Sequence, residues 1–125
     1  MTSVLCLHGM GGTAATMAPI VAALRAAGHD AHAITLPGHG RDPEHLVGVG
    51  WTDWLVAASA HAADVVVGQS MGAVLALAIA AGGGCRAVVA INPLAPDPDA
   101  VDGLEWRRDR GTEWIEVAPS SVGEV

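Results

Sequence analysis

The chain contains no lysine. Its 125 residues carry six arginines against thirteen carboxylates, which gives a formal net charge of −7. Proteins that bind nucleic acids or anionic membrane surfaces usually do so through clustered basic side chains. The six arginines form no long basic run in the sequence, and the three at positions 107, 108 and 110 are interrupted by Asp109. We therefore expect neither a nucleic acid nor an anionic membrane as a partner.

Long apolar runs are missing as well. The longest run, Ala73–Ala81, is far shorter than the roughly 20 residues that a helix needs to cross a bilayer. The first twelve residues, MTSVLCLHGMGG, have no basic region, and their apolar run is too short for a signal peptide. The sequence therefore predicts no membrane span and a cytoplasmic location.

Cysteine is scarce, and histidine is confined to the first half of the chain. The two cysteines, Cys6 and Cys85, are expected to be free thiols that behave as small hydrophobic residues. The six histidines are His8, His29, His32, His39, His45 and His61. Their spacing does not suggest a metal site, so we predict no bound metal.

Hydrophobic residues make up 51% of the chain, and their distribution indicates one domain with alternating strands and helices. Four apolar runs predict strands: Val4–Leu7, Ala31–Leu36, Asp64–Val67 and Arg86–Ile91. Helical periodicity predicts helices at about residues 14–27 and 51–62, and a run of small apolar residues that stops at three glycines predicts a third at 71–81. Non-alternating apolar strands joined by helices predict an α/β fold, with a parallel sheet flanked by helices in three α/β/α layers.

The character of the sequence changes after Pro93. The remaining residues are acidic and contain no strong strand pattern. We expect an amphipathic helix from Asp99 to about Arg110, with Val101 and Leu104 facing inward.

The first of two glycine-rich turns, HGMGGTA at residues 8–14, can be read as a dinucleotide-binding fingerprint. That fingerprint also requires a carboxylate near the end of the second strand. The second strand ends in Leu36-Pro37-Gly38 and has no carboxylate there. Asp30 precedes that strand and would lie at the wrong end of the sheet. Nucleotide binding is therefore the least favoured interpretation.

The second turn, Gly68-Gln69-Ser70-Met71-Gly72, lies between a predicted strand and a predicted helix. A sharp reversal there holds the serine in a strained conformation, and glycines two residues before and after it remove side chains that would collide. The free amides at the helix N-terminus then point at the oxyanion that forms when the serine attacks a carbonyl group. The pattern favours a nucleophilic serine; the alternative is a tight turn with an incidental serine.

Three motifs, LHGMGGT, LPGHG and VVVGQSMGA, resemble the amino-terminal half of an α/β-hydrolase in their order and spacing. The segment PGHG, followed by Asp42-Pro43-Glu44 and a helix with Trp51 and Trp54, is similar to the carboxylesterase and monoacylglycerol-lipase branch. The resemblance extends from residue 3 to about residue 96.

This resemblance implies a serine ester hydrolase that acts through an acyl-enzyme at Ser70. The backbone N–H groups of Met10 and Met71 match the two oxyanion donors, and His8 matches a structural histidine. We expect a small or medium-chain ester as substrate, because the loops are apolar and no charged recognition residue stands out. No organic cofactor is implied.

The chain departs from the family in one respect. In α/β-hydrolases the triad runs serine, acid, histidine, but no histidine follows Ser70 here. We expect residues 1–96 to form the amino-terminal half of a hydrolase core and residues 97–125 to begin a truncated lid. The triad acid and histidine would then be absent from this chain, which would leave it weakly active or inactive by itself.

The family resemblance also predicts the order of the strands. Across the sheet the order would be second, first, third, fourth, which leaves the strand Arg86–Ile91 with an unpaired edge. Self-association through that edge is one expectation. Two other functions stay open: a non-catalytic binding module that retains the fold, and an acyltransferase or thioesterase that shares the serine turn.

Overall fold

The structure is a computed structural model that describes residues 1–61, 63–93, 106–108 and 115–117. Its elements, with η marking short 3-10 helices, are β1 (Ser3–Leu7), η1 (Ala14–Met17), α1 (Ala18–Ala26), β2 (Asp30–Ile34), η2 (Pro43–Leu46), α2 (Trp51–Ser59), β3 (Val65–Gln69), α3 (Met71–Ala81), β4 (Ala87–Ile91), β5 (Trp106–Arg108) and β6 (Ile115–Val117). The predicted alternation of strands and helices is confirmed over the first 91 residues.

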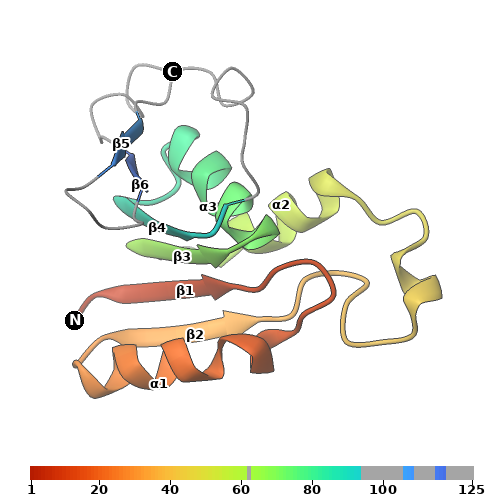
Figure 1. Ribbon diagram of the computed structural model, residues 1–125, viewed down its shortest axis with the longest axis horizontal. Coiled ribbons are helices and arrows are strands. Elements are labelled where there is room, and N and C mark those ends of the chain that lie inside the picture. Colours follow the sequence, from red (N-terminus) through yellow and green to blue (C-terminus); the bar gives the residue numbers. More distant parts are fainter. Residues whose placement is uncertain (62, 94–105, 109–114, 118–125) are drawn as a thin grey trace.

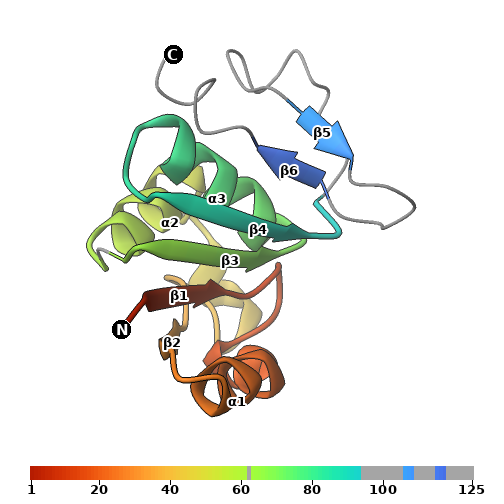
Figure 2. The ribbon, with the colours of Figure 1, turned by 90° about the vertical axis from the view of Figure 1, so that its left-hand side faces the viewer.

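The sheet has the order β2-β1-β3-β4-β6-β5. The first four strands are parallel, with Leu5 of β1 opposite His32 of β2 on one side and opposite Val66 of β3 on the other. Figure 2 shows β4, β3, β1 and β2 following one another across the molecule. The predicted order of second, first, third, fourth is therefore confirmed.

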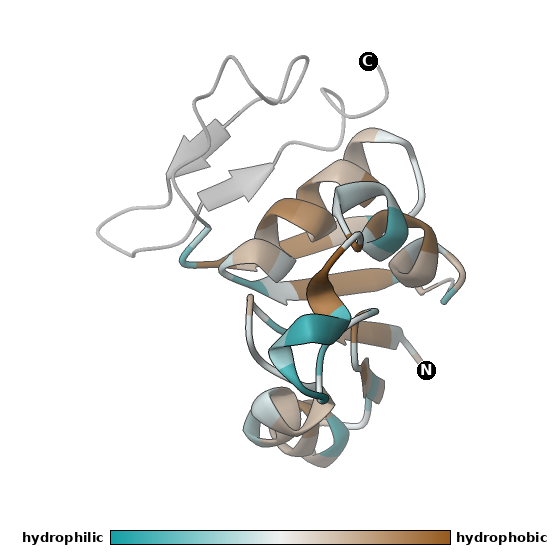
Figure 3. Ribbon diagram, turned by 90° about the vertical axis from the view of Figure 1, so that its right-hand side faces the viewer, coloured by the Kyte–Doolittle hydropathy of each residue, from teal (hydrophilic) through white to brown (hydrophobic). Residues whose placement is uncertain are grey.

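Helices cover both faces of this sheet, as predicted. Alternate residues of β1 point to opposite faces. Leu5 and Leu7 join the core beneath α2 and α3, whereas Val4 and Cys6 join the core beneath α1. The two helix groups lie on opposite sides of the strands in Figure 1. Apolar residues are concentrated in the central strands and α3 (Figure 3). Each buried strand is thus apolar on both faces, which explains its unbroken apolar run.

Two expectations for the region after Pro93 are wrong. The edge of β4 does not lack a partner, because β6 pairs with it antiparallel, with Ala90 opposite Ile115. Within the segment expected to be helical, Trp106–Arg108 forms strand β5, which pairs with β6. Residues 99–105 and 109–110 of that expected helix lie outside the described residues, as does most of the lid predicted for residues 97–125.

The second strand differs from its prediction at its end. It was expected to reach Leu36, yet β2 stops at Ile34. The N–H of Leu36 donates to Nε2 of His8 at 2.9 Å instead of to a neighbouring strand, so the chain leaves the sheet before that residue. None of the helices in the described ranges is long and apolar enough to span a membrane.

Candidate active site

Ser70 lies at the turn between β3 and α3, in a backbone conformation that a non-glycine residue rarely adopts. Its φ is 54° and its ψ is −117°. Such a conformation costs on the order of 1–3 kcal/mol and persists only where its surroundings enforce it. The N–H of Ser70 donates to the carbonyl of Ile91 in β4 at 2.9 Å, and the carbonyl of Ser70 accepts from Ala73 at 3.0 Å. Hydrogen bonds to the sheet and to the helix therefore fix the strained residue on both sides.

The two glycines that flank the serine are required by close backbone contacts. A Cβ on Gly68 would collide with the carbonyl of Gly72 and lie 2.6 Å from the nitrogen of Ala73. A Cβ on Gly72 would collide with the carbonyl oxygen of Leu7 and lie 2.5 Å from that of His8. The first glycine lets the helix fold back on the strand, and the second lets the helix approach β1.

The N-terminus of α3 begins directly at the serine. Met71 is the first residue of α3, so its N–H has no acceptor within the helix. The N–H of Ser70 is already bonded to β4, which makes the amide of Met71 the first that can serve an anion beside the serine. The side chain of Met71 is buried among Leu7, Leu36 and Trp54. This burial anchors the start of the helix.

The loop after β1 lies against the serine. Gly9 to Gly12 form a turn in which the N–H of Gly12 donates to the carbonyl of Gly9 at 3.0 Å. Gly11 has a φ of 80°, which a type II turn requires at that position. A Cβ on Gly9 would lie 3.1 Å from Cβ of Ser70 and 3.7 Å from its Oγ. The two glycine-rich turns of the sequence therefore meet at one end of the sheet.

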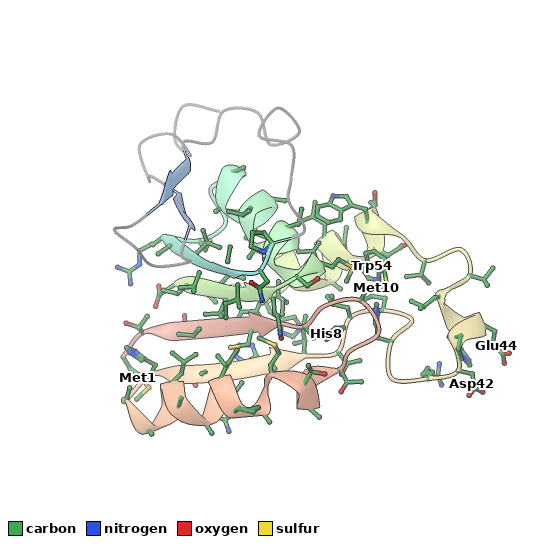
Figure 4. All side chains as sticks on the ribbon, viewed as in Figure 1. Met1, His8, Met10, Asp42, Glu44 and Trp54 are labelled. Atoms are coloured by element: carbon green, nitrogen blue, oxygen red, sulfur yellow. The ribbon has the colours of Figure 1, made fainter. Side chains whose placement is uncertain are left out.

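Met10 follows Gly9 in this loop, and 58% of its surface is exposed. Figure 4 shows Met10 at the same end of the sheet as His8, while Met1 lies at the other end. Gly9, which directly precedes Met10, is the loop residue whose contact with Ser70 is defined. An apolar side chain at this position adds no charge to the surface beside the serine.

His8, the last residue before this loop, is fully buried. Its Nδ1 lies 2.7 Å from the carbonyl oxygen of Gly9, and its Nε2 accepts the N–H of Leu36 at 2.9 Å. The ring is therefore neutral, with the proton on Nδ1. Burial chiefly lowers the pKa of His8; the Gly9 carbonyl raises it and the nearby His39 lowers it further. Both ring nitrogens are occupied, so His8 positions the loop and is no base for Ser70.

His39 of the PGHG segment is also buried, with 6% of its surface exposed. Its Nδ1 lies 3.2 Å from the carbonyl oxygen of Pro37, which also accepts the indole N–H of Trp54 at 2.9 Å. The ring meets His8 and Trp54 edge-on, with centroids 4.8 Å and 5.7 Å away. Its Nε2 is buried and has no hydrogen-bond partner among the described residues. His39 thus joins three segments beneath the candidate site.

Among the described residues, no base is hydrogen-bonded to the serine. Within them, no side-chain hydrogen bond involves Oγ of Ser70; the buried imidazoles nearby instead bond to backbone groups. Three exposed ligand-type side chains do cluster near η2: Asp42, Glu44 and His45. Asp42 and Glu44 lie far from His8 and Met10 in Figure 4. This cluster is remote from the serine.

One residue beside the site was not singled out from the sequence. Asn92 follows Ile91, the residue that accepts the N–H of Ser70, and it has a φ of 45° and an exposed side chain. The Asn-Pro pair that ends the strand signals a turn. The sequence alone does not show that this turn lies next to the serine.

A strained serine between a parallel strand and a helix, set against a glycine-rich loop, has the backbone arrangement that α/β-hydrolases use for their nucleophile turn. The sequence profile of the Alpha/beta hydrolase family matches residues 4–123 of this chain. The chain therefore belongs to that family, and the resemblance seen in its sequence motifs is confirmed at this level.

Solved structures give the same result. A structure from work on two metagenome-derived lipolytic enzymes, LipS and LipT, matches with a TM-score of 0.68 and 25% identity, covering 78% of this chain and 46% of that one. A thioesterase domain from the curacin biosynthetic pathway matches with a TM-score of 0.61 and 28% identity, covering 71% of this chain and 37% of the domain. This chain thus spans less than half the length of either structure. No curated protein sequence matches significantly.

Proposed function

We propose that this chain carries the nucleophile and the oxyanion site of a serine ester hydrolase of the carboxylesterase or lipase-like kind. The observation that carries the proposal is the strained conformation of Ser70, with a φ of 54°, at the N-terminus of α3 and against Gly9. A tight turn with an incidental serine would not need this strain. Strain of this kind is concentrated at functional sites.

In the proposed reaction Oγ of Ser70 attacks the acyl carbonyl, and the carbonyl oxygen becomes an oxyanion. The N–H groups of Met10 and Met71 donate to that oxyanion. Collapse of the tetrahedral intermediate breaks the ester C–O bond, and the alcohol leaves with a proton. Attack by water on the acyl-enzyme then releases the acid and restores the Ser70 hydroxyl. Removing one oxyanion donor from such a site typically lowers kcat by about 10²–10³.

The proton of Ser70 needs an acceptor, because a serine hydroxyl is a weak nucleophile without an adjacent base. We assign the base and its acid partner to residues that this chain does not contain, since no histidine follows Ser70 and both nitrogens of His8 are occupied. A site of this kind that lacks its base retains a residual rate of about 10³–10⁴ over water. The chain alone is therefore expected to be slow.

The substrate class follows from the surroundings of the serine. The loop beside Ser70 presents glycines and the apolar side chain of Met10. The chain has no lysine, and Arg41, which follows the PGHG segment, is exposed to solvent. A small or medium-chain uncharged ester fits this environment. The likeness to a structure associated with lipolytic enzymes supports the same class.

Acyl trapping tests the proposal. The purified chain is incubated with a short-chain p-nitrophenyl ester, and its intact mass is followed together with that of Ser70→Ala. We expect one acyl group per chain on Ser70, which accumulates because deacylation also lacks its base, and none on the variant. Acylation that persists in Ser70→Ala would show that Ser70 is not the nucleophile.

Thioester cleavage or acyl transfer is the second candidate, favoured by the likeness to a thioesterase domain. The same trapping experiment with an acyl-coenzyme A thioester separates the two. Faster acylation of Ser70 by the thioester than by an oxygen ester of matched leaving-group pKa would favour this alternative. We rank it second because no pantetheine-binding pattern is visible in the sequence.

A further inference from the structure

Two histidines that are far apart in the sequence lie together beside α2. His32 is on β2, opposite Leu5 of β1, and His61 follows the end of α2. Their ring centroids are 5.8 Å apart, and the ring planes meet at 51°. His32 is half-buried and His61 is exposed. This pair is separate from the buried pair of His8 and His39.

The separation of the rings suits shared coordination of one metal ion. A Zn–N bond is about 2.0–2.1 Å, which places the metal about 3.2 Å from an imidazole centroid. Two such rings on one ion then have centroids about 5.2 Å apart at a tetrahedral angle and about 6.4 Å apart at a linear one. The observed 5.8 Å lies between these limits. The distance between the two rings is therefore compatible with one ion held between them.

The nitrogens of this pair are also free to bind. The rings of His8, His39 and His45 are within hydrogen-bond distance of backbone groups. No such contact occupies His32 or His61 in the part of the chain that the structure describes. The closer pair, His8 and His39, cannot coordinate in the same way because both nitrogens of His8 are occupied.

We propose that His32 and His61 form a site for a divalent transition metal such as Zn²⁺ or Cu²⁺. One imidazole nitrogen from each residue binds the ion, and water completes its coordination. Imidazole is a preferred ligand of these metals, and the net charge of −7 favours cations over anions. Mg²⁺ and Ca²⁺, which prefer oxygen ligands, are excluded by the donor set.

This site lies away from the candidate catalytic serine. His61 lines a cavity of about 330 Å³ together with Leu5, Ser59 and Gly84. Gly84 precedes β4, and His61 precedes β3, so this cavity opens at the amino ends of the parallel strands. Ser70 follows the carboxyl end of β3. The histidine pair and Ser70 are therefore two separate sites in the fold.

Titration of the tag-free full chain with Zn²⁺ at pH 7.5, followed by calorimetry, tests the proposal. We expect one ion per chain, and at least a tenfold loss of affinity in His61→Ala and in His32→Asn. His45→Ala is the matched control, because it also removes one histidine and disrupts the exposed cluster of Asp42, Glu44 and His45. It should change the affinity by less than twofold.

Copper provides a second readout. The electron paramagnetic resonance spectrum of the Cu²⁺ complex should show coupling to two imidazole nitrogens in the unmodified chain and to one in His61→Ala. Loss of binding in His45→Ala, or unchanged binding in His61→Ala, would overturn the proposal. His61 is exposed, so His61→Ala decides the question even if His32→Asn fails to fold.

Discussion

Replacing Ser70 with cysteine tests the electrostatic environment of residue 70 in a way that does not depend on a general base. A thiol ionises by itself near neutral pH, and its reactivity reports its own pKa. At the start of α3 the thiolate would face the free N–H of Met71 and the positive end of an 11-residue helix. We therefore expect the pKa of the thiol in Ser70→Cys to be lowered.

The size of this effect can be worked from the helix. A charge at a helix N-terminus is stabilised by about 0.3–1 kcal/mol, and by up to about 2 kcal/mol where it is partly buried. Each pKa unit corresponds to about 1.36 kcal/mol, so the thiol pKa should fall from about 8.5 to about 7–8.3. The thiolate fraction at pH 7 would rise from about 3% to as much as about one half.

The assay is the rate of iodoacetamide alkylation between pH 5 and 9, read by intact mass. The native thiols contribute little, because burial raises the pKa of Cys6 and of Cys85. Ser59→Cys is the matched control: Ser59 is the last residue of α2 and is exposed. The negative end of that helix should raise its thiol pKa.

The order of the two pKa values decides the test. A thiol pKa in Ser70→Cys that equals or exceeds that in Ser59→Cys would refute the reasoning. It would mean that the amides at the start of α3 do not act on the side chain of residue 70. The oxyanion site proposed around the Met71 amide would then have no electrostatic basis.

Two further predictions concern stability, and urea unfolding measures both. Gly72→Ala should lower the free energy of unfolding by about 3 kcal/mol or more, because the new methyl group meets backbone carbonyls of β1. A Cβ at Gly82 has its nearest contacts at 3.7 Å, so Gly82→Ala should change the free energy of unfolding by no more than about 1 kcal/mol. Similar losses of stability in both variants would contradict the packing argument. Burial lowers the pKa of His8 in the folded chain. As the pH falls, the His8 imidazole is therefore protonated in the unfolded chain before it is protonated in the folded chain. The free energy of unfolding should therefore decrease below about pH 6.5. The decrease should be smaller in His8→Gln. An equal decrease in that variant would show that His8 is not responsible.

Much of the fold could be predicted because its determinants are local. Each parallel strand is a short apolar run; α1 and α2 have an apolar periodicity, and α3 is a continuous apolar segment that ends at a run of glycines. Gly68 has a local cause too, since its contacts are with Gly72 and Ala73 in the same turn, whereas Gly72 is required by contacts with Leu7 and His8. The expectation that these glycines relieve collisions is confirmed.

Interactions between distant segments could not be predicted in the same way. The local sequence pattern predicts a helix at Trp106–Arg108. That pattern carries no information about β6, the strand with which this segment pairs. The bond between His8 and Leu36 joins two segments whose order in the sequence gives no sign of contact. The proximity of His32 and His61 likewise depends on how α2 crosses the sheet. The spacing of the histidines alone had suggested no metal site.

Fluorophosphonate labelling tests the central claim, that Ser70 is a nucleophile whose base lies outside this chain. The probe reacts with activated serines in many hydrolases and does not depend on ester specificity. Intact-mass analysis should show a slow adduct on Ser70 that is absent from Ser70→Ala. An adduct of equal rate in the variant would place the reactive group elsewhere. A rapid adduct confined to Ser70 would show that a residue of this chain, or of a second copy, already supplies the base.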